Sequence, residues 1–345
     1  MNKIYIIYYE WANTVNNHAG MAYLAQKIKD KYPENIRLFK HIHRFDFNYW
    51  LRKLYIVYSP IYSFLLSIYI YLTIKENDIV LFLEYENHLP GNEQYIARIL
   101  RRMGLENKFI ALIHHPEKVL KKMFTELQII DDLSYVDKVL CFGSSLKKYL
   151  SQLKKSTDII QTYHYVDIDF YSPTKVDNYE NKERLKVICI GNQLRNYKLL
   201  YNVARLCSEI DFIICKGLNK DMEFDGLNNV KSFGYLNEQS LLDLMCSCDI
   251  SLNIMNDTVG SNVIVTSLAC GLAIVSSDVG SIRDYCNETN SILCPNNDYS
   301  FQKALLFLNG NRDVCNSMKI SCRETALNIS LEKFLNNEFP DILDK

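Results

Sequence analysis

A loop of glycine, serine and asparagine precedes an apolar stretch in the segment DTVGSNVIVTSLACGLAIVSSDVGSIRDYC, residues 257–286. Gly260, Ser261 and Asn262 stand where this loop enters an expected helix. Free backbone N–H groups and the helix dipole at such a turn favour an anion, and small residues let a phosphate approach closely. An ordinary N-cap, in which Ser261 or Asn262 bonds the first helical amide, explains the same residues equally well.

A second glycine turn follows in the same segment. It ends an expected strand at Asp278 and opens an expected helix through Ser281. The spacing from Ser281 to Asp284 is that of a capping box, which accounts for both residues. Gly280 then needs only to turn the chain.

Apolar strands alternate with amphipathic helices along the whole chain, which is typical of parallel sheets covered by helices on both faces. In the first half we expect strands at 3–10, 36–42, 78–86, 108–115, 138–143 and 158–166, and helices at 19–32, 54–73, 92–104 and 144–153. In the second half we expect strands at 186–191, 211–217, 230–234, 250–255, 272–278 and 291–295, and helices that begin near Lys198, Glu238, Asn262, Ser281, Tyr299 and Asn311.

The predicted fold class is therefore α/β, with two doubly wound Rossmann-like domains in series. A chain of 345 residues is too long for one ordinary core. We expect an N-terminal, acceptor-side domain at 1–170, a linker at 171–185, a ligand-binding domain at 186–330 and a C-terminal helix at 331–345. Ligand crevices at the carboxyl ends of the strands make the cleft between the domains the natural active site.

Charge and cysteine content narrow the class of protein. The net charge of −1 argues against a general nucleic-acid binder. The eleven cysteines lie mostly in apolar runs and show no CxxC pairs or histidine spacing typical of a zinc site. We expect them to be reduced core residues of a cytoplasmic protein, because the first residues also lack a signal peptide's cleavage pattern.

The segment 54–73 is about as long as a membrane span and carries no charge. It also contains Pro60 and five tyrosines, and a helix that is buried or lies on a bilayer surface has the same composition. The first half also contains basic residues at three- and four-residue spacing, which would share helix faces. They are Arg98, Arg101, Arg102, Lys118, Lys121 and Lys122. This combination suits an anionic membrane surface, and ordinary solvated helix faces explain the basic residues equally well.

The order of pieces in GSNVIVTSLACGLAIVSSDVGSIRDY resembles the nucleotide-sugar segment of family 4 glycosyltransferases, where a loop, a helix ending in A-C-G, a short strand and S-D-V-G-G follow one another. The stretches at 165–173, 230–255 and 328–334 resemble further motifs of that family. The resemblance covers most of 165–334 and implies the GT-B fold, with two facing domains and the donor held mainly by the second. One glycine turn would then receive the diphosphate and the other would leave room for the sugar.

The resemblance also implies roles for particular residues. Arg195 and Lys198 would stabilise the departing diphosphate, although both would serve equally as solvated residues of a helix's first turn. His114, at the end of an expected strand, would contact the donor sugar, and a plain structural role is the alternative for it and for His115. The implied donor-binding residues are Gly20, Gly191, Gly234, Gly260, Ser261, Asn262, Val263 and Thr266.

Two positions depart from the family. Threonines stand at Thr258 and Thr266, where most members have glutamates that contact the sugar and the ribose. A hydroxyl makes a single hydrogen bond of the same kind but supplies no negative charge. Asp257 is a candidate substitute, and donor identity and stereochemistry stay open.

Other first-half candidates are less specific. Gly20 would let a phosphate or an acceptor approach its backbone, and His18 is either a base or a solvated histidine. Glu84 and Glu86 follow an expected strand and are either acceptor contacts or surface carboxylates. The sequence Asp-Ile-Asp at 167–169 imitates a metal-binding motif of another glycosyltransferase fold, but it falls in the interdomain connection, so we discount it.

The function expected is transfer of a sugar from a nucleotide-diphosphate sugar to a glycan or polyprenyl-diphosphate-linked acceptor in bacterial surface polysaccharide biosynthesis. The enzyme would be a retaining, metal-independent hexosyltransferase that needs no cofactor, in the cytoplasm or peripheral on the inner face of the cell membrane. Two alternatives stay open: a nucleotide-sugar epimerase of the same fold, and a non-catalytic nucleotide-sugar or glycan-binding protein.

Overall fold

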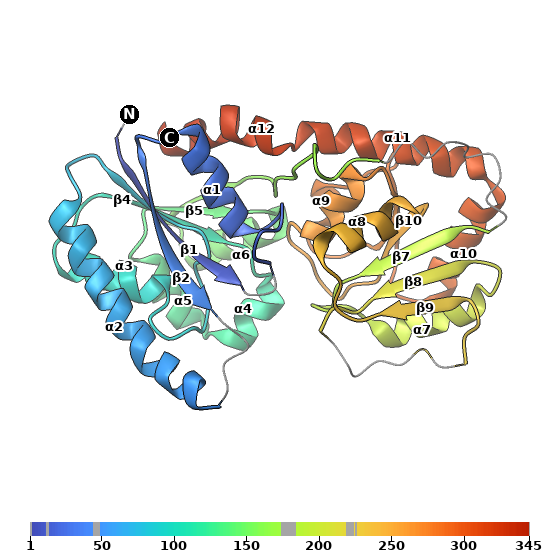
Figure 1. Ribbon diagram of the computed structural model, residues 1–345, viewed down its shortest axis with the longest axis horizontal. Helices are drawn as coiled ribbons and strands as arrows, with labels where there is room; N and C mark the ends of the chain where they lie inside the picture. The colour runs from blue at the N-terminus through green and yellow to red at the C-terminus, as the bar shows by residue number, and fades with distance from the viewer. Residues whose placement is uncertain are drawn as a thin grey trace. The chain divides into compact units, whose positions relative to one another are not determined.

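The computed structural model describes residues 2–11, 14–43, 49–173, 184–218, 224 and 226–344. It divides into two compact units, Met1–Tyr163 and His164–Lys345, referred to below as unit 1 and unit 2 (Figure 1). Most of the linker expected at 171–185 lies outside the described residues.

Unit 1 is built on a six-stranded parallel sheet with the order β2-β1-β3-β4-β5-β6. Its strands are β1 Ile4–Trp11, β2 Ile36–His43, β3 Ile79–Phe82, β4 Lys108–Ile113, β5 Lys138–Cys141 and β6 Asp158–Gln161. Every residue of β3 and β5 is buried, as the apolar runs predict for strands that are covered on both faces. Four of the strands, β3 to β6, end earlier than expected, so the polar residues after them lie in loops.

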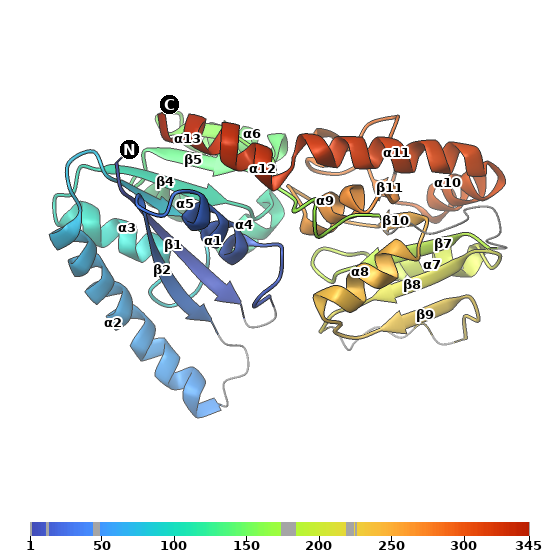
Figure 2. The same ribbon diagram turned by 45° about the horizontal axis from the view of Figure 1, so that its top comes forward.

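Six helices of unit 1 connect these strands, as Figures 1 and 2 show. They are α1 Met21–Lys31, α2 Tyr49–Thr73, α3 Glu93–Arg102, α4 Glu117–Met123, α5 Glu126–Leu133 and α6 Ser144–Leu153. The sequence analysis does not predict α4 and α5, because each is too short to show a clear period. A local signal was present, since Thr125 and Gln128 form a complete capping box at the start of α5.

Unit 2 has a second six-stranded parallel sheet, with the order β12-β11-β10-β7-β8-β9. Its strands are β7 Lys186–Ile190, β8 Asp211–Cys215, β9 Val230–Phe233, β10 Ile250–Asn253, β11 Ala273–Ser277 and β12 Ser291–Cys294. Its main helices are α7 Tyr197–Leu206, α8 Glu238–Cys246, α9 Asn262–Ala269, α10 Asp298–Gly310 and α11 Arg312–Asn328. The helix starts agree with the predicted ones to within a residue, except at Ser281.

Two expected helices of unit 2 differ from the prediction. The chain after Ser281 forms only a short 3-10 turn, Ile282–Asp284, and Ser281 makes no side-chain capping hydrogen bond. The single C-terminal helix is three consecutive pieces: α12 Leu331–Lys333, a π-helical turn Phe334–Glu338 and α13 Phe339–Asp344. Pro340 lies in the first turn of α13, where its missing N–H is tolerated.

The segment at 165–173 is fixed to unit 2 by its backbone. Arg323 on α11 donates to the carbonyl oxygens of Ile168 at 3.0 Å and Tyr171 at 2.8 Å, and to that of Ala269 at 2.7 Å. His164, the first residue of unit 2, donates its N–H to the hydroxyl of Tyr285 at 2.9 Å. These contacts anchor the beginning of unit 2 to its own sheet.

Asp167 has a structural role in this segment. Its Oδ1 accepts the N–H groups of Asp169 and Phe170, each at 3.1 Å, in a turn of the kind that aspartate favours. This geometry explains the Asp-Ile-Asp sequence without a metal ion.

The cysteines are core residues, as predicted. All eleven are free, and ten of them are buried, with only Cys246 partly exposed. Cys189, Cys207, Cys294 and Cys315 pack in the hydrophobic core of unit 2 with the apolar residues of β7, β8, β10 and β11.

Candidate active site

The candidate site of unit 2 lies where the strand order of its sheet reverses. The order makes β7 and β10 neighbours, although two strands separate them along the chain. In doubly wound sheets a ligand binds outside the carboxyl ends of the strands at this switch point. The loops that follow β7 and β10 are residues 191–196 and 254–261. Together with the start of α9, they contain most of the predicted donor-binding residues.

The two loops are hydrogen-bonded to each other. Asn196 donates its N–H to the carbonyl of Ile254 at 3.0 Å, and Asn256 donates to that of Leu194 at 2.9 Å. Arg195 and Met255 form an antiparallel bridge between them. Gly191 and Leu194 have φ angles of +89° and +56°, so the first loop needs left-handed backbone at two positions. The pairing fixes the backbone at the point where Arg195 leaves it.

The Arg195 guanidinium is partly buried beside neutral groups. Its Nη1 donates to Oδ1 of Asn253 at 3.1 Å, and Asn253 is fully buried. The Asn253 amide in turn donates to Oγ of Ser251 at 3.0 Å, which accepts from Ser267 on α9 at 2.8 Å. Burial lowers the pKa of Arg195 to about 10, so it stays protonated at neutral pH.

No carboxylate forms an ion pair with Arg195 within the described ranges. A partly buried cation held by an amide alone still lacks a counter-ion. The arrangement therefore favours an anionic ligand at this position.

The start of α9 lies beside the same guanidinium. A Cβ added to Gly191 would be 3.8 Å from Nε and Nη2 of Arg195 and 3.8 Å from Cγ2 of Val263, in the first turn of α9. Ser261 is the N-cap residue, but its side chain makes no capping hydrogen bond. The explanation of Ser261 as an ordinary side-chain cap is therefore wrong, and the first-turn amides of α9 are oriented toward the loop.

The two glycine turns of the sequence pack against each other. Gly280 has a φ of +55°, and a Cβ there would lie 2.2 Å from the Thr258 carbonyl oxygen and 2.5 Å from Oδ1 of Asp257. Ser281 donates its N–H to the same carbonyl at 2.8 Å. The position that a Cβ would take at Gly280 is filled by the protein's own chain, so packing against residues 257 and 258 is enough to require glycine there.

The two threonines that replace family glutamates are buried, and each is 6% exposed. Thr266 donates its hydroxyl proton to the carbonyl of Asn262 at 2.7 Å within α9. Its oxygen can therefore only accept a hydrogen bond from a ligand. Thr258 donates its N–H to Asp257 Oδ1 at 2.9 Å, so the Asp257 carboxylate is held against its own loop.

Two other predicted residues of unit 2 lie at different places. Lys198 is exposed in the first turn of α7, after the paired loop. Gly234 follows β9, the edge strand, which is two strands away from β7. At a strand spacing of about 4.8 Å, the structure does not bring Gly234 to the switch point.

Unit 1 has its own switch point between β1 and β3, where a buried glutamate lies. Trp11, the last residue of β1, donates its indole N–H to both Oε1 and Oε2 of Glu84 at 2.8 Å. Glu84 is 5% exposed and Glu86 is fully buried, so the surface-carboxylate explanation of this pair is wrong. Burial raises the pKa of Glu84 to about 8. Burial and the charge on Asp132 together raise the pKa of Glu86 to about 9.

The remaining candidates of unit 1 lie in loops. His114 and His115 follow β4, and their ring centroids are 4.9 Å apart. Burial lowers the pKa of His115. Gly20 is the N-cap of α1 with a φ of +88°, and His18 packs its ring on Tyr23 at 5.3 Å.

Sequence reasoning missed the polar residues that hold Arg195. Ser251 and Asn253 lie inside the otherwise apolar strand ISLNIM, and this interruption was a readable signal. Trp11 gave no comparable signal, because its contact with Glu84 joins residues 73 positions apart. Over the described part of the chain, no group of three or more His, Cys, Asp or Glu side chains could hold a metal ion.

Comparison with known proteins identifies the class to which this site belongs. Residues 184–311 match the family model described as Glycosyl transferases group 1. This match confirms the resemblance stated from the sequence over that part of the chain. No curated protein matches the chain.

Solved structures give the fold of the whole chain. Sucrose-phosphate synthase from Thermosynechococcus elongatus is 10% identical with a TM-score of 0.76, covering 100% of this chain and 98% of that one. Anabaena HepE in complex with UDP is 14% identical with a TM-score of 0.73 and 99% coverage of both chains. A glycosyltransferase from Rickettsia africae is 12% identical with a TM-score of 0.69, covering 100% and 99%.

These matches confirm the predicted α/β fold class with two Rossmann-like domains. The whole chain has the two-domain GT-B fold of these structures, and residues 184–311 match the glycosyltransferase group 1 model.

Proposed function

We propose that this protein transfers a sugar from a nucleotide-diphosphate sugar to the hydroxyl group of a glycan or a polyprenyl-diphosphate-linked acceptor, in the biosynthesis of a bacterial surface polysaccharide. A UDP-sugar is the first donor to test, because solved structures of HepE include complexes with UDP and with UDP-glucose. The acceptor class and the polysaccharide pathway rest on the sequence resemblance.

The observation that carries the proposal is the unneutralised charge of Arg195 at the switch point of unit 2. The guanidinium has Asn253 as its hydrogen-bond partner and lies beside Gly191 and the first turn of α9. A diphosphate would supply the missing negative charge to the guanidinium. Its oxygens would also accept hydrogen bonds from the backbone N–H groups of residues 260–263. Both contacts strengthen as charge develops on the departing nucleotide, so they lower the barrier to transfer.

We assign supporting roles to the other site residues. Lys198 would add positive charge from the first turn of α7, and Thr266 would accept a hydrogen bond from a ribose hydroxyl. His114 would contact the donor sugar. Because Arg195 and the α9 amides supply the positive potential, we propose transfer without a metal ion or another cofactor, with retention at the anomeric carbon.

We also propose a cytoplasmic location, peripheral on the inner face of the cell membrane, where a lipid-linked acceptor would be available. The support for this location is the apolar composition of residues 54–73, which form most of α2.

The test is nucleotide binding by isothermal titration calorimetry and thermal shift, with UDP, GDP, CMP and dTDP as probes. A ligand present at a hundred times its dissociation constant stabilises the folded protein by about 2.7 kcal/mol. We expect Arg195→Ala to weaken binding of the preferred nucleotide by at least about tenfold, because a charged hydrogen bond contributes roughly 1.5–3 kcal/mol.

The matched control is Arg205→Ala, which removes an exposed arginine from the other end of α7. Equal nucleotide affinity in Arg195→Ala and the wild type would overturn the assignment of Arg195. Turnover of a nucleotide sugar without an acceptor would support the epimerase alternative. Binding with neither transfer nor slow hydrolysis would support the non-catalytic alternative.

A further inference from the structure

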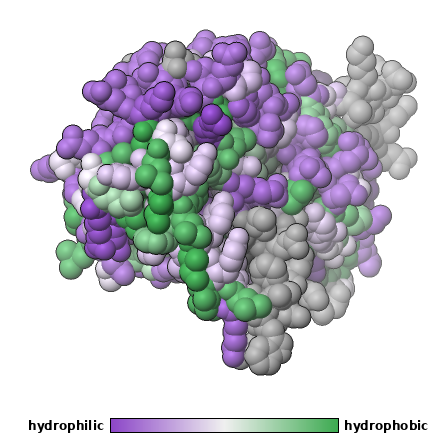
Figure 3. Space-filling model, turned by 60° about the vertical axis from the view of Figure 1, so that its left-hand side comes forward, coloured by the Kyte–Doolittle hydropathy of each residue, from purple (hydrophilic) through white to green (hydrophobic). Residues whose placement is uncertain are grey.

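Helix α2 exposes an apolar face that no other described part of unit 1 covers. Figure 3, which brings this side of the molecule forward, shows a band of hydrophobic residues running down it. The exposed fraction is 74% for Leu72, 63% for Leu54 and 58% for Leu65. The large exposed apolar residues of this helix are Leu54, Ile56, Val57, Tyr58, Ile61, Phe64, Leu65, Tyr69, Tyr71 and Leu72.

The inner face of α2 carries its small polar residues. Ser59, Ser63 and Ser67 are 2%, 0% and 0% exposed and recur every fourth residue. Ser59 donates to the carbonyl of Pro90 at 2.6 Å, Ser63 to that of Gly91 at 2.5 Å and Ser67 to that of Ser63 at 2.8 Å. The same face also buries Leu66 and Ile70, so α2 differs from a surface helix in water in its outer face, which is apolar instead of polar.

The close approach of α2 to unit 1 explains the serines. A Cβ on Gly91 would lie 2.6 Å from the carbonyl oxygen of Ser59 and 2.8 Å from Cα of Pro60, so the two backbones are in direct contact. Small residues that allow such close helix packing are typical of helices in an apolar medium. The inner side of α2 is thus adapted to the protein and its outer side to something other than water.

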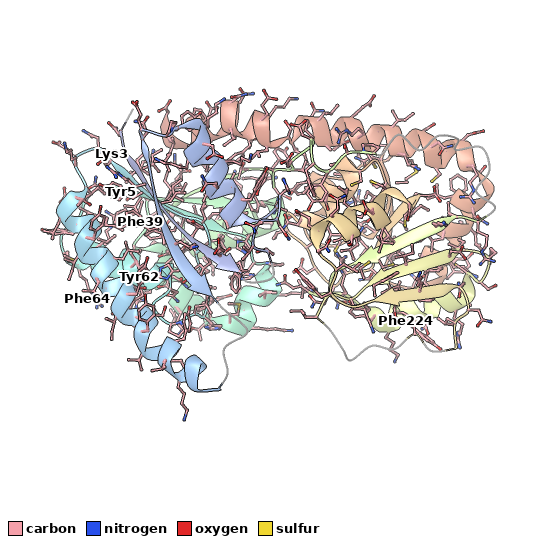
Figure 4. The ribbon with its side chains drawn as sticks, viewed as in Figure 1. Lys3, Tyr5, Phe39, Tyr62, Phe64 and Phe224 are labelled. Atoms are coloured by element: carbon pink, nitrogen blue, oxygen red, sulfur yellow. The ribbon has the colours of Figure 1, made fainter. Side chains whose placement is uncertain are left out.

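Further contacts dock α2 onto the sheet of unit 1. Tyr5 donates its hydroxyl to the carbonyl of Thr73 at 2.9 Å, and Phe39 meets Tyr69 edge to face at 5.7 Å. Figure 4 shows Tyr62 on the side of the sheet and Phe64 on the outer side. Residues Lys53–Thr73 are long and apolar enough to cross a membrane, with 28% of that window buried, but a spanning helix would lose these contacts.

We propose that the outer face of α2 inserts into the interfacial region of a lipid bilayer, with the helix axis in the membrane plane. The inference rests on the membrane location proposed above and is independent of the transfer reaction. In this proposal α2 alone makes the membrane contact, and burial of its apolar surface in the lipid drives binding.

The width of the apolar face favours lipid over a second copy of the chain. At about 100° per residue, the exposed apolar side chains cover more than half of the circumference of α2. Two α2 helices that pack together bury one stripe each and would leave the remainder in water. Acyl chains are fluid and can surround a convex surface of this width.

The charges around α2 also suit a bilayer surface. Residues 49–73 contain no Asp or Glu, and the exposed Lys53 and Lys75 lie near its two ends. Tyr58, Tyr69 and Tyr71 are exposed on this face, and tyrosine is a residue type enriched at the boundary between lipid and water.

Two of the basic residues that would suit an anionic membrane surface are paired with carboxylates inside unit 1. Arg98 pairs with Asp131 and Asp132, and Arg101 pairs with Asp137 at 2.6 Å. Because these cations are neutralised internally, anionic lipid is not required for binding. Apolar insertion should therefore persist with neutral lipid at high salt, where charge attraction is screened.

The test is flotation of the purified full chain with vesicles of phosphatidylcholine alone, in about 0.5 M NaCl to screen charge. We expect the wild type to float with the vesicles. The triple variant Ile61→Gln, Leu65→Gln, Leu72→Gln should bind at least about tenfold more weakly, because each substitution removes a large apolar side chain from the lipid. A control with equally exposed residues elsewhere, Leu127→Gln, Leu218→Gln, Ile320→Gln, should bind within about twofold of the wild type.

Three results would overturn the proposal. Failure to float with neutral vesicles excludes apolar insertion, and resistance to carbonate extraction from membranes indicates a spanning helix. A dimer by light scattering that the α2 triple variant abolishes identifies a second copy as the occupant. UDP binding of the triple variant is measured in solution in parallel. Loss of vesicle binding can then be distinguished from damage to the donor site.

Discussion

At the scale of single residues, the chemistry of unit 2 depends on how Arg195 is held. Its partner Asn253 is neutral and fully buried, and Ser251 orients the amide. A carboxylate at the same place would satisfy the guanidinium permanently. The choice of an amide therefore keeps the positive charge available to a ligand.

Asn253→Asp should show whether UDP binding depends on the uncompensated positive charge of Arg195 or only on the position of its side chain. The new carboxylate would lie within about 3 Å of Nη1 of Arg195 and neutralise it without changing the size of the side chain. We expect UDP affinity to fall by at least about tenfold, because the anionic ligand then competes with an internal counter-ion. Ser251→Ala, which leaves Asn253 in place, should change affinity less. Unchanged UDP affinity in Asn253→Asp would show that the nucleotide binds elsewhere.

Glu86→Gln should change the pH dependence of stability. Burial raises the pKa of Glu86 from an ordinary carboxyl value to about 9, so the folded state binds this proton more tightly than the unfolded state does. Stability is therefore lost as the pH rises from about 5 through about 9. Urea denaturation at several pH values in that range should show a smaller loss for Glu86→Gln than for the wild type, by about 1–3 kcal/mol.

The control for this measurement is Glu34→Gln, which changes an exposed glutamate of the same unit. It should follow the wild-type pH profile. Parallel profiles of Glu86→Gln and the wild type would mean that Glu86 is charged in the folded protein.

The sequence points to candidate site residues, but it does not show how deeply each one is buried or what surrounds it. Arg195 and residues 260–263, which the resemblance assigns to the donor, lie beside one switch point of the structure. The burial of Glu84 and Glu86 could not be predicted, because it depends on Trp11 and on helices that contact them from distant parts of the chain.

At the scale of elements, the loops after β10 and β11 form one structural unit. Met255 donates its N–H to Oγ of Ser277 at 2.8 Å, and Asn296 donates to the carbonyl of Met255 at 2.8 Å. Gly280 completes this packing, since only a glycine fits beside Thr258. The loop that would bind the diphosphate is thus supported by its neighbours before any ligand arrives.

Gly280→Ala should destabilise this pair of loops. Its Cβ would meet the Thr258 carbonyl oxygen at 2.2 Å, and its φ of +55° is unfavourable for alanine. We expect a loss of about 2–4 kcal/mol in the free energy of unfolding, together with weaker UDP binding. Gly310→Ala, at a helical position with nothing within 4 Å of a Cβ, should be neutral or stabilising. Equal stability of the two variants would contradict the loop packing.

The sequence pattern predicted the long helices and strands correctly but missed the short helices. The apolar run at 54–73 correctly predicts a helix, which the structure extends back to Tyr49. Its inner and outer faces could not be assigned from the sequence, because serines and leucines alternate at similar spacing. Only the contacts with Pro90 and Gly91 show that the serines face the protein.

At the scale of the whole molecule, the cysteines offer a test of the fold. Ten of the eleven are buried, and burial raises the pKa of the Cys207 and Cys286 thiols to about 12. A buried thiol reacts slowly because both access and thiolate are lacking. In Ellman titration of the native protein we expect one rapidly reacting thiol, at Cys246, and eleven after denaturation. Loss of the rapid phase in Cys246→Ser checks the assignment, and several rapid thiols would contradict the packing of unit 2.

The architecture of both units could be predicted because alternating strands and helices leave few arrangements other than a parallel doubly wound sheet. Strand order could not be predicted from the pattern alone. The reversal between β7 and β10, which brings residues 191–196 beside 254–263, depends on which strands pair. The donor site therefore became visible as a site only with the sheet topology.

The interlocked glycine turns have a structural consequence. Thr258 is hydrogen-bonded to Ser281, and one short 3-10 turn later the hydroxyl of Tyr285 holds the backbone of His164, where the chain passes from unit 1 to unit 2. A short path of hydrogen bonds thus joins the 257–261 loop to the backbone at the start of unit 2.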